Sequence, residues 1–140
     1  MVERLAEGVY RLDAVPIRNA INLLLVESGG SRTLIDAGVG SSAARVGRAL
    51  GSLGVHPKDL RTIYLTHHHS DHIGGLQRMR ELAPEAEIAA FWYEAEILRG
   101  ERERTRLRAR FSAASAAGRN CRSCQTRDPS TRAMSWAACV

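Results

Sequence analysis

The sequence has no apolar run long enough to cross a membrane. Its longest uninterrupted aliphatic run is Leu23 to Val26, far below the roughly 20 residues that a membrane-spanning helix needs. The first 16 residues interleave charged and apolar side chains, so they also lack the continuous apolar segment of a secretory signal peptide. We therefore expect a cytoplasmic protein that does not contact a membrane.

Lysine is almost absent, because Lys58 is the only lysine among 20 basic residues. Such an arginine bias is more typical of codon composition than of selection for phosphate contacts. The charge is also unevenly distributed: residues 1–100 hold 11 basic and 12 acidic side chains, whereas residues 101–140 hold 9 and 3. The net charge of +5 therefore arises at the end of the chain, and it is weak evidence for a nucleic-acid partner.

Large apolar residues are scarce in the last part of the chain, where Val140 is the only Leu, Ile, Val or Phe after Ser112. Such a segment cannot bury enough apolar surface to offset the entropy of ordering it. We expect residues 102–140 to be a basic Ala/Arg/Ser-rich tail that is disordered, with at most a weak helix around residues 107–117, or that arises from a shifted reading frame. Residues 1–101 would then form the folded domain.

Cysteine occurs only in this tail. Cys121 and Cys124 have the CxxC spacing of a zinc site, but a closed structural zinc site generally needs four ligands and only Cys139 remains. We interpret the pair as a chance spacing of reduced thiols. The alternating arginines would scatter around a helix, and the tail holds only two aromatic side chains, so a nucleic-acid-binding tail is the least favoured interpretation.

The apolar periodicity of the first 100 residues predicts strands alternating with helices. Short β-rich runs are interrupted by glycine turns, and two longer segments place apolar residues at helical spacing. We expect strands at residues 9–12, 21–27, 33–35, 62–66 and 87–90, and helices at residues 41–53 and 71–82. This order predicts an α/β layered domain in which helices pack on a sheet.

The most informative segment, THHHSDHIGG, directly follows the fourth expected strand. Imidazole and carboxylate groups suit zinc and related divalent ions. In an extended loop, residues two apart face the same side, so His67, His69 and Asp71 can line one wall while His68 points away. His72 follows at the start of the next helix and can turn toward the same pocket. An incidental histidine tract is disfavoured by the preceding strand, the aspartate in register and the following helix.

Two adjacent glycines follow these histidines inside the expected helix. Gly74 and Gly75 each cost of order 1 kcal/mol relative to alanine in a helix. A cost of this size predicts that another part of the molecule approaches the backbone closely there.

The segment THHHSDH resembles the THxHxDH signature of the metallo-β-lactamase superfamily, and residues 34–38, LIDAG, resemble that family's earlier LIDTG motif. The resemblance covers about residues 7–101 and implies an α/β fold, the N-terminal half of an αββα sandwich. It implies that His67 and His69 contribute to one metal site, and Asp71 and His72 to a second. Asp36 would support the ligands from behind, although an ordinary turn aspartate is the alternative.

The same resemblance implies a metal-dependent hydrolase similar to the glyoxalase II and lactonase branches. The expected reaction is hydrolysis of a thioester, ester, lactone or lactam by a metal-bound hydroxide, with Asp71 as the catalytic residue that orients the water. The implied cofactor is zinc, up to two ions, with iron or manganese as alternatives. The partner would be a small-molecule substrate, whose identity the motifs do not specify.

The resemblance also implies three further metal ligands in a second half of the fold, and two of them are histidines. His72 is the last histidine of the chain, and Asp128 lies in the wrong kind of segment. We therefore expect a truncated relative, and the alternative to a hydrolase is a catalytically inactive metal-binding remnant. Without a second sheet, the first would expose an apolar face and an unpaired edge, which favours self-association.

Overall fold

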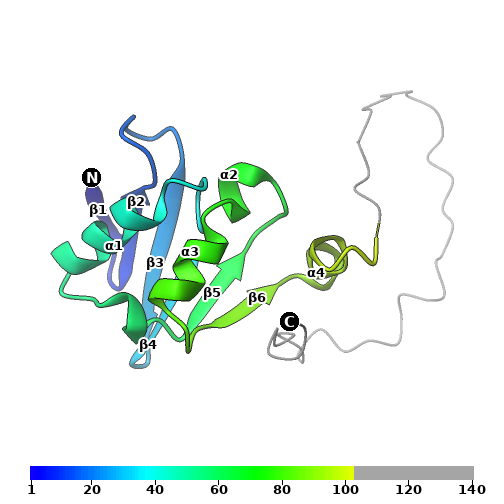
Figure 1. Ribbon diagram of the computed structural model, residues 1–140. Helices are drawn as coiled ribbons and strands as arrows, with labels where there is room; N and C mark the ends of the chain where they lie inside the picture. The colour runs from blue at the N-terminus through cyan, green and yellow to red at the C-terminus, as the bar shows by residue number, and fades with distance from the viewer. Residues whose placement is uncertain (103–140) are drawn as a thin grey trace, which may run out of the picture.

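A six-stranded sheet runs through the part of the chain that the computed structural model describes, residues 1–102 (Figure 1). The strands lie in the sheet in the same order as in the sequence. They are β1 (Val2–Ala6), β2 (Val9–Asp13), β3 (Asn22–Ser28), β4 (Ser31–Ile35), β5 (Thr62–Leu65) and β6 (Glu87–Ala90). The helices are α1 (Ala43–Ser52), α2 (Ser70–Ile73), α3 (Leu76–Leu82) and α4 (Trp92–Leu98), with a 3-10 turn, η1 (Pro57–Asp59), between α1 and β5.

The sheet pairs in two ways. Strands β1 to β4 form an antiparallel meander, and Gly29 and Gly30 turn the chain between β3 and β4 with φ of 56° and 78°. These left-handed conformations are easily adopted only by glycine. Strands β4, β5 and β6 are parallel, so each pair needs a crossover connection. Helix α1 lies in the first crossover, and α2 and α3 lie in the second.

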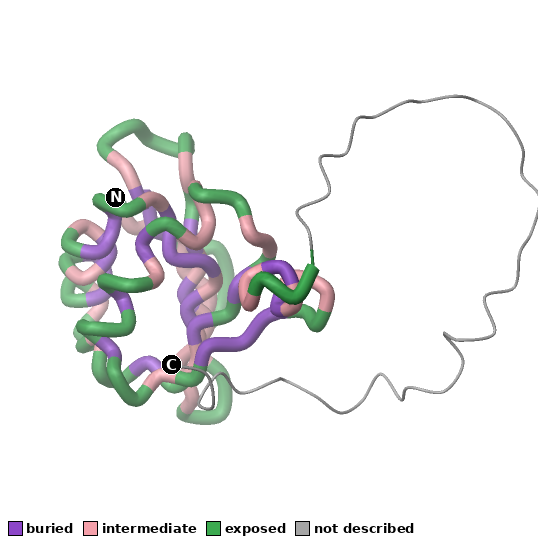
Figure 2. The backbone as a smooth tube through the Cα atoms, turned by 45° about the vertical axis from the view of Figure 1, so that its right-hand side comes forward, coloured by how far each residue is buried: buried purple, intermediate pink, exposed green. Residues whose placement is uncertain are grey.

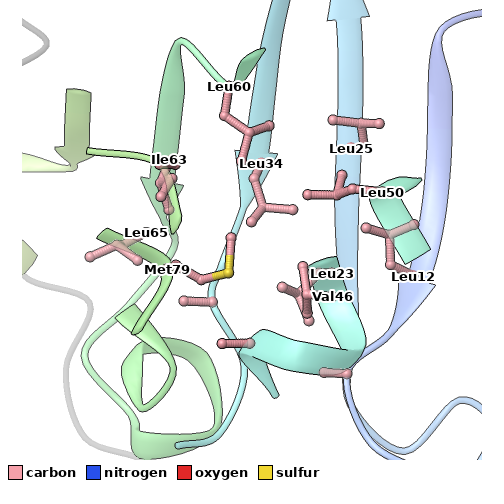
Figure 3. Close-up of a cluster of buried hydrophobic side chains, with 14 of the residues drawn as sticks. Leu12, Leu23, Leu25, Leu34, Val46, Leu50, Leu60, Ile63, Leu65 and Met79 are labelled. Carbon is pink, nitrogen blue, oxygen red and sulfur yellow. The ribbon is translucent and has the colours of Figure 1, made fainter. Parts of the chain in front are cut away.

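One face of the sheet carries the main core. Leu25 on β3, Leu34 on β4 and Ile63 on β5 lie opposite one another across the strands, and all three are fully buried. Helix α1 contributes Val46 and Leu50 to the same cluster, and α3 contributes Met79 (Figure 3). Burial of such side chains is the main favourable term in folding.

Residues on the opposite face are less buried. Leu24 and Ile35, which lie side by side on β3 and β4, are half-buried, and Tyr64 on β5 is 37% exposed. Figure 2 shows this mixture of buried and intermediate residues along the strands, with exposed residues at the turns. The apolar face that the sequence predicts to be incompletely covered is therefore partly accessible to solvent.

The mixed α/β fold expected from the sequence is confirmed, and each expected strand is present with small shifts at its ends. The single helix expected at residues 71–82 is wrong, because the chain forms α2 and α3 with Gly74 and Gly75 between them. The amide of Gly75 donates to the carbonyl of Gly38 at 2.9 Å instead of to a carbonyl of its own helix. A tertiary hydrogen bond therefore interrupts the helix.

Two elements were not expected. Strand β1 has mostly exposed residues and pairs only with β2, so it lacks the apolar alternation of a half-buried strand. Helix α4 begins within three consecutive aromatic residues, Phe91 to Tyr93, which favour strands in isolation. Burial of Ala95 and Ile97 stabilises the helix instead.

Several expectations concern residues outside the described part of the chain. These are the disordered or frame-shifted tail, the weak helix at 107–117, the cysteine pair Cys121 and Cys124, and the exclusion of Asp128 as a ligand. Within residues 1–102, no helix is long and apolar enough to cross a membrane. The cytoplasmic location stays a prediction.

Candidate metal centre

The histidine-rich loop lies where the parallel strands end. β5 leads into residues 66–69, β4 leads into the loop that starts at Asp36, and β6 leads into the start of α4. Because β4, β5 and β6 are parallel, their carboxyl ends lie at the same edge of the sheet. In open α/β sheets, ligands bind in crevices outside this edge. The candidate site therefore occupies the position that the topology favours for chemistry.

Backbone contacts lock the loop after β4 to the segment after the histidines. Gly38 and Ile73 form an isolated parallel bridge, and the amide of Ala37 donates to the carbonyl of His72 at 2.7 Å. A Cβ atom added at Gly75 would lie 2.2 Å from the carbonyl oxygen of Ala37. The close backbone approach predicted from the two glycines is confirmed, and its partner is the loop that follows β4.

Asp36 lies at the centre of the hydrogen bonds behind the histidines. The residue is 5% exposed and has a φ of 64°, a left-handed conformation that aspartate tolerates better than most residues. Its carboxylate accepts hydrogen bonds from the Thr66 amide at 2.8 Å and from the Thr66 hydroxyl, and it pairs with Nδ1 of His72 at 2.7 Å. Asp36 therefore holds Thr66 and the ring of His72, and its role behind a metal ligand stays a prediction.

These hydrogen bonds also decide which ring nitrogens are free. An ionised Asp36 carboxylate can only accept, so Nδ1 of His72 is the donor of this hydrogen bond. Thr66 has one hydroxyl proton, which Asp36 accepts, so the 3.0 Å contact between Thr66 Oγ1 and His67 Nδ1 makes His67 the donor. In the neutral form of each ring, Nε2 is therefore the nitrogen with the lone pair that can bind a metal ion.

The structure brings the four predicted ligands together. The ring centroids of His67 and His72 are 3.8 Å apart, and those of His67 and His69 are 4.7 Å apart. Asp71 Oδ2 lies 3.5 Å from Nε2 of His72, and half of the Asp71 side chain is exposed. One surface thus combines three imidazoles with a carboxylate that solvent can reach.

The pKa of His67 is lowered from its ordinary value of 6.5. Burial is the main cause, and the neighbouring rings of His72 and His69 lower the pKa further, whereas Asp36 and Asp71 raise it. A lowered pKa keeps this imidazole neutral near pH 7. The neutral form is the one that a metal ligand requires.

The described residues do not form a finished metal-binding group. Within residues 1–102, no set of three or more His, Cys, Asp and Glu side chains is arranged to hold a metal ion. The four side chains share one surface without converging on one point. Their assignment as metal ligands therefore stays a prediction.

His68, in the middle of the loop, forms a pair with Glu94 on α4. Oε2 of Glu94, on α4, lies 2.7 Å from Nδ1 of His68 and accepts the His68 amide at 2.9 Å. The sequence interpretation expects His68 to point away from the pocket, and it gives no indication of Glu94. Twenty-six residues separate the two, and no periodicity links them. The sequence interpretation also gave no role to Thr66, which links Asp36 to His67 and is the first residue of the THHHSDH motif.

Comparisons with known proteins agree with this description. The family model described as "Metallo-beta-lactamase superfamily" matches residues 17–133. The "Uncharacterized protein YobT" of Bacillus subtilis (strain 168) is 33% identical over 95 residues, which cover 68% of this chain and 40% of that protein. The chain therefore spans about 40% of the length of this curated relative.

Solved structures of metallo-beta-lactamases resemble the fold. A HARLDQ-motif mutant of the enzyme from Cronobacter sakazakii is 27% identical with a TM-score of 0.62, covering 74% of this chain and 39% of that chain. The metallo-beta-lactamase MIM-1 from Novosphingobium pentaromativorans is 26% identical with a TM-score of 0.60, covering 71% and 34% respectively. In both cases the similarity extends over less than half of the solved structure.

Proposed function

The chain belongs to the metallo-beta-lactamase superfamily, and from this premise we propose that residues 36–72 supply one half of the active site of a metal-dependent hydrolase. The expected substrates are thioesters, esters, lactones or lactams. The observation that carries the proposal is the packing of His67, His69 and His72 beside Asp71, with Asp36 behind His72. Because the chain spans about 40% of its curated relative, the activity is proposed for the completed site.

The residues fit a metal ion in their chemistry. Hydrogen bonds at Nδ1 of His67 and His72 leave Nε2 of each neutral ring as the nitrogen that can bind zinc. The family resemblance assigns two ligands to each of two sites, His67 and His69 to one, Asp71 and His72 to the other. Each proposed site thus has only two ligands from residues 1–102. This agrees with the absence, in that part of the chain, of three or more side chains arranged around one metal ion. Iron and manganese also accept this ligand set.

Two carboxylates of the protein would orient the water and a metal ligand. A bound divalent cation would supply Lewis-acid activation of water and of the substrate carbonyl. Asp71 has a carboxylate that solvent can reach, so it can accept a hydrogen bond from the attacking water and orient it. Asp36 holds His72 in one tautomer and one orientation, which a ligand needs before it can bind tightly.

The experiment is metal analysis of the purified full chain beside two variants. His69→Ala removes a proposed ligand, and His56→Ala removes the one histidine outside the cluster, which caps η1. We expect zinc to co-purify with the wild type and His56→Ala and to be reduced in His69→Ala. Equal zinc content in all three proteins would contradict the proposed ligand set.

A second candidate function is metal binding without turnover. It is favoured by the lack of a complete ligand group among residues 1–102. Thioester and lactone hydrolysis assays on the zinc-loaded chain distinguish the two. Turnover lost in Asp71→Asn would support the hydrolase, and tight zinc binding with no turnover would support the binding protein.

Nucleic-acid binding through the basic tail stays the least favoured proposal, since its arginines alternate along the chain and only two aromatic side chains accompany them. Binding through phosphate contacts weakens steeply as salt rises. Salt-dependent binding of a duplex that disappears when residues 101–140 are deleted would support it, and salt-independent binding would contradict it.

A further inference from the structure

The loop between the proposed ligands His67 and His69 is held by a residue from a distant helix. A single carboxylate oxygen of Glu94 accepts the main-chain amide of His68 at 2.9 Å and lies 2.7 Å from Nδ1 of its ring. Both side chains are largely buried, with 18% of His68 and 15% of Glu94 exposed. A shared acceptor of this kind fixes both the backbone and the side chain of His68.

Helix α4 has contacts that do not involve this pair. Ala95 is fully buried and Ile97 is 5% exposed, so the helix has its own apolar anchor. Beyond its carboxyl end, Arg102 pairs with Glu96 at 2.7 Å and lies 4.9 Å from the centre of the Tyr93 ring. We therefore expect the helix to keep its position when the Glu94–His68 pair is removed.

Fixing His68 has a direct consequence for its neighbours. The ring of His69 meets both neighbouring rings edge to face, with centroids 4.7 Å from His67 and 5.0 Å from His68. Holding His68 against Glu94 therefore also limits where the ring of His69 can lie. The loop is thus held from two sides, by Asp36 through Thr66 and His72, and by Glu94 through His68.

We propose that Glu94 is a positioning residue for the metal-ligand pair His67 and His69. This inference rests on the proposed function, because it assigns Glu94 a role toward the metal that these histidines would bind. Without Glu94 the loop must be ordered when the metal binds, and that entropy cost opposes binding. We expect zinc affinity to fall about tenfold, at the lower end of the effect of removing the partner of a ligating histidine.

The test compares three variants of the full chain. Glu94→Ala removes the acceptor, and Glu94→Gln keeps the size and one acceptor oxygen for the His68 amide while losing the charge. Glu96→Gln is the matched control, because it changes the same residue type two positions along α4 and removes the charge from the pair with Arg102. Zinc affinity is measured by competition with a chelator, and amide hydrogen exchange is measured on the metal-free proteins.

The expected result is a graded loss of zinc affinity, about tenfold in Glu94→Ala, smaller in Glu94→Gln and absent in Glu96→Gln. In metal-free Glu94→Ala, the His68 amide should exchange faster while the amides of α4 keep their protection. A merely structural role would instead reduce protection throughout α4 and leave the affinity of Glu94→Gln unchanged, and this result would overturn the inference.

The two proposals fail in different ways. If the wild-type chain binds zinc and the Glu94 variants bind it equally well, the positioning role is overturned and the proposed function stands. If the wild-type chain does not bind zinc, the proposed function is overturned and the inference falls with it.

Discussion

The two halves of the sheet differ in what their connections carry. The antiparallel strands β1, β2 and β3 are connected at alternate ends of the strands, by a short turn and by the loop of residues 14–21. No histidine occurs before His56. The parallel strands β4, β5 and β6 all end at one edge, where Asp36, the histidine loop and Glu94 meet. Parallel pairing collects residues that are far apart in the sequence, whereas the meander serves mainly to build the core.

Two buried aspartates, one in each half, show that burial alone does not identify a functional group. Asp13 and Asp36 are 3% and 5% exposed. Asp13 lies 3.4 Å from the amino terminus and accepts the Asn19 amide at 3.3 Å. Asp36 instead holds the ring of His72. The partner of each carboxylate, not its exposure, distinguishes Asp13 from the carboxylate that we propose to support a metal ligand.

The largest expected effect comes from adding one methyl group at a crowded glycine in each half. A Cβ at Gly75 would lie 2.2 Å from the Ala37 carbonyl oxygen, and one at Gly8 would lie 2.4 Å from the Glu27 carbonyl oxygen. We expect Gly75→Ala and Gly8→Ala each to lower the free energy of unfolding by about 3 kcal/mol, measured by urea denaturation. Only Gly75→Ala should also weaken zinc binding.

The control for these variants is Gly51→Ala, because a Cβ there meets nothing within 4 Å. Gly51 lies near the end of α1, so alanine should be neutral or stabilise the protein by up to about 1 kcal/mol. An equal loss of zinc affinity in Gly8→Ala and Gly75→Ala would show that the two halves are coupled and would break the comparison.

A smaller effect is expected from neutralising the two aspartates in turn. In Asp36→Asn, the amide group can donate toward His72 and so favours the tautomer with a proton on Nε2, which cannot bind a metal. We expect a loss of about 2 kcal/mol in the free energy of unfolding and a 10- to 100-fold loss in zinc affinity by chelator competition. Asp13→Asn should leave zinc affinity unchanged, and a comparable loss there would contradict the division of roles.

The pH dependence of the metal-free protein should also originate in the parallel half. Because the pKa of His67 is lowered from 6.5 in the folded state, the unfolded chain takes up the proton first as the pH falls. The contribution of His67 is therefore absent well above pH 6.5, and the free energy of unfolding falls as the pH drops from 6.5 toward the folded pKa and levels off below it. Urea denaturation between pH 7.5 and 5 checks this.

In His67→Gln, the free energy of unfolding should decrease less between pH 7.5 and 5 than in the wild type. In His56→Gln, the decrease should equal that of the wild type. Hydrogen exchange at pH 5 should show the loss of protection first in residues 66–75, with β1 to β3 unaffected. A pH dependence that persists unchanged in His67→Gln would assign the effect to other groups.

The smallest expected effect concerns the less-buried face of the sheet, which we propose as a surface for self-association. Tyr64, which is 37% exposed on this face, can be replaced by lysine at little cost in stability, about 0.5 kcal/mol. Sedimentation velocity should show less association in Tyr64→Lys than in the wild type. Ile17→Lys, at a 70% exposed loop position, is the control and should associate like the wild type.

The sequence predicted the parts of the fold that depend on local patterns. The strand positions followed from apolar runs, and the close approach at Gly74 and Gly75 followed from the cost of glycine in a helix. The break between α2 and α3 could not be predicted, because it depends on a hydrogen bond from Gly75 to Gly38, which the sequence separates by more than 30 residues. Helical periodicity continues through the break and conceals it.

The proximity of the candidate ligands could also be predicted from local sequence, whereas the long-range contacts around them could not. His67, His69, Asp71 and His72 are neighbours in the sequence, so their proximity required only a short loop and the start of a helix. Glu94 comes from a helix that the sequence did not indicate, and its pairing with His68 depends on the parallel register of β5 and β6. Contacts of this type can be found only once the sheet order is known.

The bridge between Gly38 and Ile73 bears on how this architecture tolerates change in evolution and in engineering. The position of the histidines relative to Asp36 is set by backbone pairing between the two loops, and the length of the crossover through α1 does not set it. The exposed position Gly54, between α1 and η1, could therefore accept insertions without moving the histidines, whereas Val55 is 2% exposed and belongs to the core. Chimeras that keep residues 34–40 and 66–75 together would preserve the site, whereas a junction that separates these two segments would not.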